Sequence, residues 1–405
     1  GVAKRVLIYT NHFYPENFKV NEIASLLDGE GFEVTVITGL PNYPSGVIYE
    51  GFGVFQKPKK YLESIVVKRL LLIPRGSGSK LRLVINYLSY FLSCIFYTLY
   101  ISICKKKYDV VFVHHTSPIL IAFPPIIYKW FRGAKLMLWD LDMWPDTLVA
   151  MDIIKNKKIT AFLERIVGWL YRRYDHILIG SKSFKTKAES RVSLNRIAYF
   201  PNWAERVFTE KNKTSVDLQI EFPEGFKIMY AGNIGAAQDF ESVLKTMLIL
   251  KDTPVTWLFV GDGRKRKWLE QEIKTHGISH RVRFYGSHPL ETMPYFFSQA
   301  DVLFFSLKDE ALFSKTVPAK LQAYMASSKP IIGMISGEGR QLIIDSNCGL
   351  SVKSGDFKGF AEAITTLQTA SATDLKMYSK CGSDYYERHF SLQSRTVQLL
   401  NLLNA

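Results

Sequence analysis

An apolar run, a glycine turn and a helical pattern follow one another in residues 226–240, Phe-Lys-Ile-Met-Tyr-Ala-Gly-Asn-Ile-Gly-Ala-Ala-Gln-Asp-Phe. The apolar run from Ile228 has the length and composition of a buried parallel strand. It breaks at Gly232 and Gly235, and helical spacing begins at Gln238. Such a turn can bind a phosphate, because glycine lets backbone N–H groups approach an anion and a helix start carries partial positive charge. A βα turn without a ligand is the alternative, and this stretch alone favours it.

The second half of the chain repeats this pattern at two further strand ends. A strand predicted over 254–260 leads into Gly261-Asp-Gly-Arg264, which brings glycines and a cation together. A strand predicted over 329–333 leads into Gly337-Glu-Gly-Arg340 before another helix. Strands that alternate with helices in this way predict a parallel α/β domain.

A cation at a helix start indicates a bound anion. A helix is predicted from Pro318, because proline suits a first turn, and Lys320 lies in that turn. A positive side chain there is unfavourable unless an anion shares the site. We therefore expect a diphosphate beside Lys320.

The first half begins with a strand at 6–9, a helix at 20–27 and a strand at 33–38. This βαβ order predicts a doubly wound parallel sheet, which binds ligands at the carboxyl ends of its strands. Tyr14 and Asn17 lie in the loop after the first strand, where aromatic and amide groups suit a sugar or a lipid headgroup. A capped turn is an equal alternative.

Two histidines follow a strand predicted over 109–113. A histidine in that position can hydrogen-bond a sugar hydroxyl or act as an acid or base, so His114 and His115 are candidates. Polar loop histidines without a role are the alternative.

Acidic and aromatic residues follow the strand predicted over 134–139. Asp142 and Trp144 suit a carbohydrate hydroxyl and a stacked sugar ring. Asp140 and Asp142 could instead form a metal-binding pair, but no further carboxylate or histidine cluster supports one, so we expect no metal.

The segment from Leu83 to Cys104 has no charged residue and has basic residues on both sides. Its length would permit a membrane span. Polar and tyrosine residues dilute it, however, and the chain then enters a strand of the same sheet. We expect a helix that packs on the sheet by one face and enters an anionic membrane surface by another. A fully buried core helix is the alternative.

The composition of the chain limits the other possibilities. A length of 405 residues predicts about two domains, and a net charge of +15 favours an anionic partner. Nucleic acid is not expected, because the basic residues are spread through helices with few aromatic stacking runs. The four cysteines have no metal-binding spacing and indicate a reducing compartment. The first residues lead directly into a strand, so no cleavable signal peptide is expected.

Several motifs in one order resemble glycosyltransferase family 4. They are Gly232-Asn-Ile-Gly-Ala-Ala-Gln238, Gly261-Asp-Gly263, Pro318-Ala-Lys-Leu-Gln-Ala-Tyr-Met-Ala326 with Lys329-Pro330, and Gly337-Glu-Gly339. Asp142-Met-Trp-Pro-Asp146 and Pro201-Asn-Trp203 resemble the branch that acts in O-antigen, capsule and colanic-acid assembly, in particular an N-acetyl-L-fucosamine transferase of O-antigen synthesis.

The resemblance implies the GT-B fold, in which two Rossmann-like domains face each other across a cleft. The domains expected are an acceptor-binding domain at 1–203, a nucleotide-sugar-binding domain at 204–385, and a C-terminal helix at 386–405 that packs back on the first domain. No metal is implied, because helix termini and cations neutralise the leaving diphosphate.

The resemblance also assigns roles by position. The catalytic candidates are His115, Asp142 and Lys320. The donor-binding candidates are Gly232, Asn233, Gly235, Gln238, Asp239, Gly263, Arg264, Lys315, Gly337, Glu338 and Gly339. The acceptor-binding candidates are Tyr14, Asn17, His114 and Trp144.

Two departures from the family pattern concern the donor site. The usual pair of glutamates falls on Lys315 and Ala323, and the usual cations of the first glycine turn fall on Asn233 and Gln238. Ribose binding through the second glutamate therefore cannot be assumed. The missing cations must be replaced by others, such as Lys320.

These features predict transfer of a sugar, N-acetyl-L-fucosamine, from a UDP-sugar to undecaprenyl-diphosphate-linked GlcNAc in O-antigen or capsule assembly. The enzyme is expected as a peripheral protein on the cytoplasmic face of the bacterial inner membrane. The alternatives are a UDP-sugar epimerase of the same fold, a fucosyltransferase that uses GDP-fucose, and a non-catalytic protein that binds membranes or nucleic acid.

Overall fold

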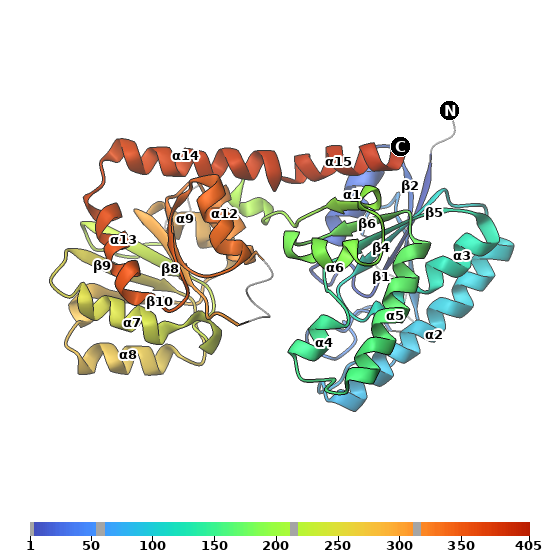
Figure 1. Cartoon of the computed structure of the whole chain (residues 1–405), viewed down its shortest axis with the longest axis horizontal. Coiled ribbons are helices and arrows are strands. Elements are labelled where there is room, and N and C mark those ends of the chain that lie inside the picture. Colours follow the sequence, from blue (N-terminus) through green and yellow to red (C-terminus); the bar gives the residue numbers. More distant parts are fainter. Residues whose placement is uncertain (1–3, 54–60, 211–217, 311–316) are drawn as a thin grey trace. The chain divides into compact units, whose positions relative to one another are not determined.

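The computed structural model describes residues 4–53, 61–210, 218–310 and 317–405. The chain divides into two compact units. Unit 1 contains Gly1–Pro201 and Asn401–Ala405, and unit 2 contains Asn202–Leu400. Each unit has a parallel sheet with helices packed on it (Figure 1).

Unit 1 is built on a seven-stranded sheet in the order β3-β2-β1-β4-β5-β6-β7, and all of its strand pairs are parallel. The strands are β1 (Arg5–Thr10), β2 (Glu33–Gly39), β3 (Val66–Leu70), β4 (Val110–His115), β5 (Lys135–Asp140), β6 (His176–Ile179) and β7 (Ile197–Tyr199). The helices are α1 (Val20–Gly29), α2 (Lys80–Cys104), α3 (Pro124–Arg132), α4 (Asp146–Ala150), α5 (Lys157–Arg173) and α6 (Lys185–Glu189). Because every strand runs in the same direction, the loops after them gather at one edge of the sheet.

Unit 2 repeats the architecture with six parallel strands in the order β10-β9-β8-β11-β12-β13. The strands are β8 (Phe226–Ala231), β9 (Val255–Val260), β10 (Val282–Gly286), β11 (Val302–Ser306), β12 (Ile331–Met334) and β13 (Gly349–Val352). The helices are α7 (Phe240–Ile249), α8 (Arg266–Thr275), α9 (Met293–Ser298), α11 (Ala319–Ala326), α12 (Glu338–Ser346), α13 (Phe357–Thr369) and α14 (Ala372–His389). The last helix, α15 (Leu392–Asn404), begins in unit 2 and ends in unit 1.

Helix α2 is the crossover between β3 and β4, which belong to the same sheet. One face packs into the core of unit 1, where Tyr90, Cys94 and Ile101 are buried with residues of α3 and α5. The opposite face is exposed. Its exposed apolar residues are Leu81, Val84, Leu88, Leu92, Phe96, Tyr100 and Ile103, which we call the α2 stripe. By length and by its mean hydropathy of 1.5, α2 could cross a membrane, but a crossover helix with a packed face is a different arrangement.

The expected α/β class with two parallel sheets is confirmed, but the predicted loop after Val113 is wrong. Strand β4 continues to His115, because His114 pairs with both Thr10 and Trp139 in the neighbouring strands. Both imidazoles are consequently buried rather than displayed on a loop.

The sequence patterns do not predict β3, α3 and α13. Strand β3 lies at the edge of its sheet, and its side chains alternate between exposed and partly buried until Leu70. Its sequence, VVKRL, therefore lacks the uniform apolar run of the central strands.

Candidate active site

Two glycine turns of unit 2 are packed backbone against backbone. The N–H of Gly232 donates to the carbonyl of Val260 at 2.8 Å, and the N–H of Ile234 donates to that of Asp262 at 2.9 Å. Gly261 has a φ of +139°, and a Cβ on it would lie 1.9 Å from the carbonyl oxygen of Gly232. Only glycine fits there, so the glycine turns after β8 and β9 form one rigid surface.

Lys320 projects from the first turn of α11 onto this surface. Its Nζ lies 3.1 Å from the hydroxyl of Tyr230 and 4.4 Å from the centre of that ring. A Cβ on Gly232 would lie 1.8 Å from the same Nζ, so the glycine leaves room for the ammonium. Burial lowers the pKa of Lys320 to about 8. Among the residues that the structure describes, no carboxylate lies within 4.0 Å of it.

A cavity of about 420 Å³ opens at this point in unit 2. Its polar wall contains Gly232, Asn233, Asp262 and Lys320. The remaining lining residues are mostly apolar or aromatic: Phe208, Ala231, Val260, Leu290, Met293, Phe297, Ala319, Ala323 and Tyr324, together with Glu205, Gly261, Ser287 and His288. The size suits a small ligand, and a lining that combines polar groups with apolar and aromatic ones suits a nucleoside diphosphate.

The structure brings only some of the predicted donor residues to the cavity. Gly263 packs against Asn233, which lines the cavity, and a Cβ on Gly263 would lie 2.6 Å from the side chain of Asn233. Gln238 is used within its own turn, where its Oε1 accepts from the N–H of Gly235 at 2.9 Å. Asp239 has a φ of +54° and precedes α7. Neither Gln238 nor Asp239 lines the cavity, so the helix whose first turn faces it is α11 rather than α7.

The third glycine turn lies behind the start of α11. A Cβ on Gly339 would lie 3.2 Å from a ring carbon of Pro318, but Gly337, Glu338 and Gly339 do not line the cavity. Arg264 is exposed and does not line it either. Lys315 lies outside the described residues.

Sequence reasoning missed three groups at this site: Glu205, Tyr230 and Asp262. Asp262 stands inside the Gly-Asp-Gly motif, and one of its carboxylate oxygens accepts from the N–H of Gly263 at 2.8 Å. Tyr230 lies in β8, and no sequence pattern predicts that its hydroxyl contacts a lysine 90 residues later in the chain. Glu205 follows the expected domain boundary at residue 203, where no pattern marked it.

In unit 1, His115 belongs to a buried polar network. Its Nδ1 lies 2.7 Å from Oδ1 of Asp140, and the hydroxyl of Tyr171 donates to the other oxygen of that carboxylate. His115 and Asp140 are 0% and 1% exposed. Among the described residues, the Nε2 of His115 has no hydrogen-bond partner. The network fixes the imidazole at the carboxyl end of β4 but keeps it from solvent.

His114 points to the opposite face of the sheet. Its Nδ1 lies 2.8 Å from the hydroxyl of Thr10, and its ring lies 5.3 Å from that of Trp139. Burial, with smaller contributions from His12 and His115, lowers the pKa of His114 to about 3. His114 is therefore neutral at physiological pH and does not exchange protons in that range.

Asp142 and Trp144 are brought together in the loop after β5. The carboxylate of Asp142 accepts from the indole N–H of Trp144 at 3.1 Å and from the hydroxyl of Thr147 at 2.5 Å. The same indole lies 3.3 Å from the hydroxyl of Ser117 in the loop after β4. These bonds shape the loops beside His115.

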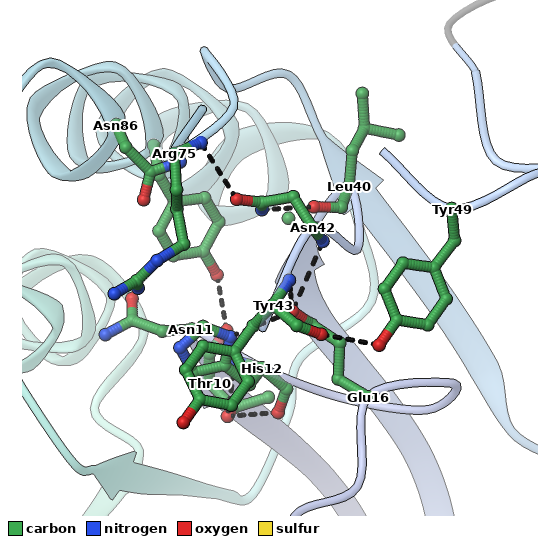
Figure 2. A network of polar contacts seen from close by, with 12 residues as sticks. Thr10, Asn11, His12, Glu16, Leu40, Asn42, Tyr43, Tyr49, Arg75 and Asn86 are labelled. Carbon is green, nitrogen blue, oxygen red and sulfur yellow. Dashed lines mark hydrogen bonds and ion pairs between the residues drawn. The ribbon is translucent and has the colours of Figure 1, made fainter. Parts of the chain in front are cut away.

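Tyr14 and Asn17 are exposed in the loop after β1. Between them, the buried carboxylate of Glu16 binds a neighbouring loop (Figure 2). Its Oε2 lies 3.1 Å from Nδ1 of His12 and accepts from the backbone N–H of Tyr43 at 2.7 Å. The loop after β2 is thus attached to the loop after β1.

Asn42 extends this network to the chain after β3. Its backbone N–H donates to Glu16 at 3.3 Å, and its side-chain oxygen accepts from the backbone N–H of Arg75 at 3.0 Å (Figure 2). The sequence predicts none of these contacts, because a long loop without periodicity carries no sign of which residues meet.

Within the described part of the chain, no group of three or more histidine, cysteine, aspartate or glutamate residues could hold a metal ion. Asp140 and Asp142 are joined through the backbone, because the N–H of Asp142 donates to the Asp140 carboxylate at 3.3 Å.

Comparison with known proteins shows which proteins this chain resembles. Residues 225–370 match the family model of the group 1 glycosyl transferases. The probable glycosyltransferase WbjE of Pseudomonas aeruginosa is 24% identical over 297 residues, which cover 71% of this chain and 73% of that protein. The putative colanic acid biosynthesis glycosyl transferase WcaI of Escherichia coli strain K12 is 24% identical over 311 residues, which cover 73% and 75%.

A solved structure matches the fold over the whole chain. HepE from Anabaena, in complex with UDP and glucose, has a TM-score of 0.65 at 14% identity and covers 99% of each chain. The matched family segment contains both glycine turns and Lys320. The chain therefore has the GT-B fold, with two parallel Rossmann-like sheets, and the segment that contains both glycine turns and Lys320 is similar to the group 1 glycosyl transferases.

Proposed function

We propose that this glycosyltransferase moves N-acetyl-L-fucosamine from its UDP-linked form to a polyprenyl-diphosphate-linked GlcNAc. The observation that carries the donor assignment is Lys320, a cation without a carboxylate within 4.0 Å among the described residues, beside the glycine turn at Gly232. A nucleotide-sugar diphosphate supplies the missing negative charge. The UDP in the HepE complex, a protein of the same fold, supports a uridine nucleotide.

In this reaction the site must stabilise UDP as the leaving group. A hydroxyl oxygen of the acceptor forms the new bond to the anomeric carbon, and the bond from that carbon to the β-phosphate oxygen breaks. UDP leaves with the electron pair, and the proton of the hydroxyl passes to the released diphosphate or to solvent. Lys320 and the start of α11 lie where they offset the charge that develops on the diphosphate.

The α2 stripe supports a lipid-linked acceptor. A soluble protein rarely exposes a contiguous apolar surface of this length, and such surfaces mark interaction sites. Exposed lysines stand at both ends of α2, at Lys80 and at Lys105–Lys107. Apolar side chains between basic ends suit a helix that lies in the plane of a membrane with anionic headgroups.

Neighbouring helices extend this surface. Helix α3 packs beside α2 and exposes Trp130 and Phe131, and α5 exposes Phe162 beside the basic Arg165. A peripheral enzyme on the cytoplasmic face of the bacterial inner membrane would reach both a soluble nucleotide sugar and a lipid-linked acceptor. The name of WcaI, a putative colanic acid biosynthesis glycosyl transferase, supports a role in the assembly of colanic acid or a related polysaccharide.

A screen of UDP-sugars tests the proposal. The purified chain is incubated with each UDP-sugar and a lipid-diphosphate GlcNAc, with and without EDTA, and released UDP is measured. Release that requires both UDP-N-acetyl-L-fucosamine and the acceptor, and that survives EDTA, supports the proposal. Conversion of the UDP-sugar without an acceptor would indicate an epimerase, and release only from GDP-fucose would indicate a fucosyltransferase.

A further inference from the structure

The turn that carries Arg75 is fixed by its backbone at the carboxyl edge of the unit 1 sheet. The N–H of Arg75 donates to the side chain of Asn42 at 3.0 Å, and the N–H of Gly76 donates to the carbonyl of Gly46 at 2.8 Å. The two loops are so close that a Cβ on Gly46 would lie 1.8 Å from the carbonyl oxygen of Gly76. Close packing of the two loops therefore fixes the backbone position from which the Arg75 side chain extends.

The guanidinium of Arg75 is held by aromatic rings rather than by an acid. It lies 5.3 Å from the ring centre of Tyr43 and 5.7 Å from that of Tyr87. Its bond to the hydroxyl of Tyr87, at 3.3 Å, is the one side-chain hydrogen bond it makes among the described residues. No carboxylate of those residues lies within 4.0 Å of it. A guanidinium has five N–H donors, so most of them are available to a ligand.

Glu16, the buried acid of the same cluster, does not neutralise this cation. Its Oε2 is taken by His12 and by the backbone N–H groups of Asn42 and Tyr43. Figure 2 shows Asn42 between the two charged groups, with its backbone bonded to Glu16 and its side chain bonded to the backbone of Arg75. Among the residues that the structure describes, the positive charge of Arg75 thus has no carboxylate partner.

A second arginine lies against the same turn. The Nε of Arg82 donates to the carbonyl of Pro74 at 2.8 Å, and a Cβ on Gly76 would lie 3.1 Å from that Nε. Arg82 and Lys80 occupy the first turn of α2, which contains no acidic residue. Positive side chains at a helix start are unfavourable on their own, and an anion bound there would offset them.

The α2 stripe begins in this same turn, at Leu81, which is 71% exposed. A positive site therefore stands at one end of a long exposed apolar face. We propose that Arg75 and Arg82 bind the diphosphate of the polyprenyl-linked acceptor, whose hydrocarbon chain lies along the α2 stripe. The planar guanidinium fork matches phosphate oxygens, and the two tyrosine rings hold the Arg75 fork in place. This site rests on the proposed function and identifies where its acceptor is anchored.

Farnesyl diphosphate is a soluble probe of this site that needs no turnover. Its binding to the full chain, followed by tryptophan fluorescence, is compared with that of farnesol. In Arg75→Gln we expect about 10- to 150-fold weaker binding of farnesyl diphosphate and unchanged binding of farnesol, as for the loss of a charge-assisted hydrogen bond. Lys107→Gln removes the same charge at the other end of α2 and should bind both probes as the wild type does.

Three results would overturn the assignment. One is wild-type affinity of Arg75→Gln for farnesyl diphosphate. Another is an equal loss of affinity for farnesol. The third is an equal loss of binding to phosphatidylglycerol vesicles, which would make Arg75 a contact for lipid headgroups. If Arg75→Gln does not fold, Arg75→Lys and Tyr87→Phe take its place, and both should weaken farnesyl diphosphate binding.

The same variants separate this inference from the proposed function. A wild-type protein that transfers no sugar, but binds farnesyl diphosphate through Arg75, would refute the proposed function and leave the anion site standing. A wild-type protein that transfers sugar equally well to a lipid-diphosphate GlcNAc and to an alkyl GlcNAc glycoside, with both unaffected by Arg75→Gln, would refute the anion site alone.

Discussion

Replacement of Lys320 by methionine should make the free enzyme more stable and its nucleotide binding weaker. The pKa of Lys320 is about 8, whereas a lysine in water has a pKa near 10.5. That difference corresponds to about 3 kcal/mol that folding loses by burying the ammonium. Because the cavity opens to solvent, we expect Lys320→Met to raise the unfolding free energy at pH 7 by about 1–3 kcal/mol.

The sign of this effect depends on pH. The folded protein releases its proton near pH 8 and the unfolded protein near pH 10.5, so the unfolded state binds more protons between these values. The cost of the buried charge is therefore fully present below pH 8 and disappears as the pH rises toward 10.5. The advantage of Lys320→Met should shrink over the same range.

Binding of UDP should change in the opposite direction. A charge-assisted hydrogen bond contributes about 1.5–3 kcal/mol, so Lys320→Met should weaken UDP binding about 10- to 150-fold. Tyr230 keeps its hydrogen bond to the carbonyl of Asn233, at 2.6 Å, so the variant leaves no new unpaired hydroxyl. Calorimetric titration with UDP and denaturant unfolding measure the two effects. A variant that binds UDP normally, or that is less stable than the wild type at pH 7, would refute this role for Lys320.

Three further outcomes are expected. Gly232→Ala should displace Lys320, because the new Cβ would lie 1.8 Å from its Nζ. The variant should bind UDP at least about tenfold more weakly. An unchanged affinity for UDP in calorimetric titration would contradict this expectation. The double variant Leu92→Glu/Phe96→Glu should no longer float with phosphatidylglycerol vesicles but should still bind UDP. The control variant Ile249→Glu, at an exposed apolar position of α7, should change neither property. Flotation of the double variant would exclude the α2 stripe as the membrane contact. Tyr171→Phe removes a hydrogen bond to the buried Asp140 and should lower the unfolding free energy by about 1–3 kcal/mol; a neutral effect in denaturant unfolding would show that the His115 network does not depend on it.

The parallel sheets could be predicted because their central strands are continuous apolar runs, and in unit 2 β8 and β9 are also followed by glycine turns. The strand at Ile228 and the turn at Gly232 stand out in the sequence for this reason. Lys320 could be singled out as well, since a cation at a helix start is electrostatically unusual. Its contact with Tyr230 could not, because the two residues meet only when β8 and α11 pack together.

The first unit shows where sequence patterns fail. His114 and His115 look like loop residues, yet β4 lies between β1 and β5 and both neighbours extend its hydrogen-bonded ladder. Arg75 and Glu16 lie in segments without periodicity, and their partners come from other loops. Contacts of this kind depend on tertiary structure, which a single sequence does not encode as a local pattern.

The account depends on one claim, that the cavity of unit 2 binds the diphosphate of the donor. A crystal structure of the complex with UDP tests it most directly. We predict the β-phosphate within hydrogen-bond distance of the Nζ of Lys320 and beside the glycine turn at Gly232. A UDP molecule bound elsewhere, with Lys320 still contacting only Tyr230, would contradict the account.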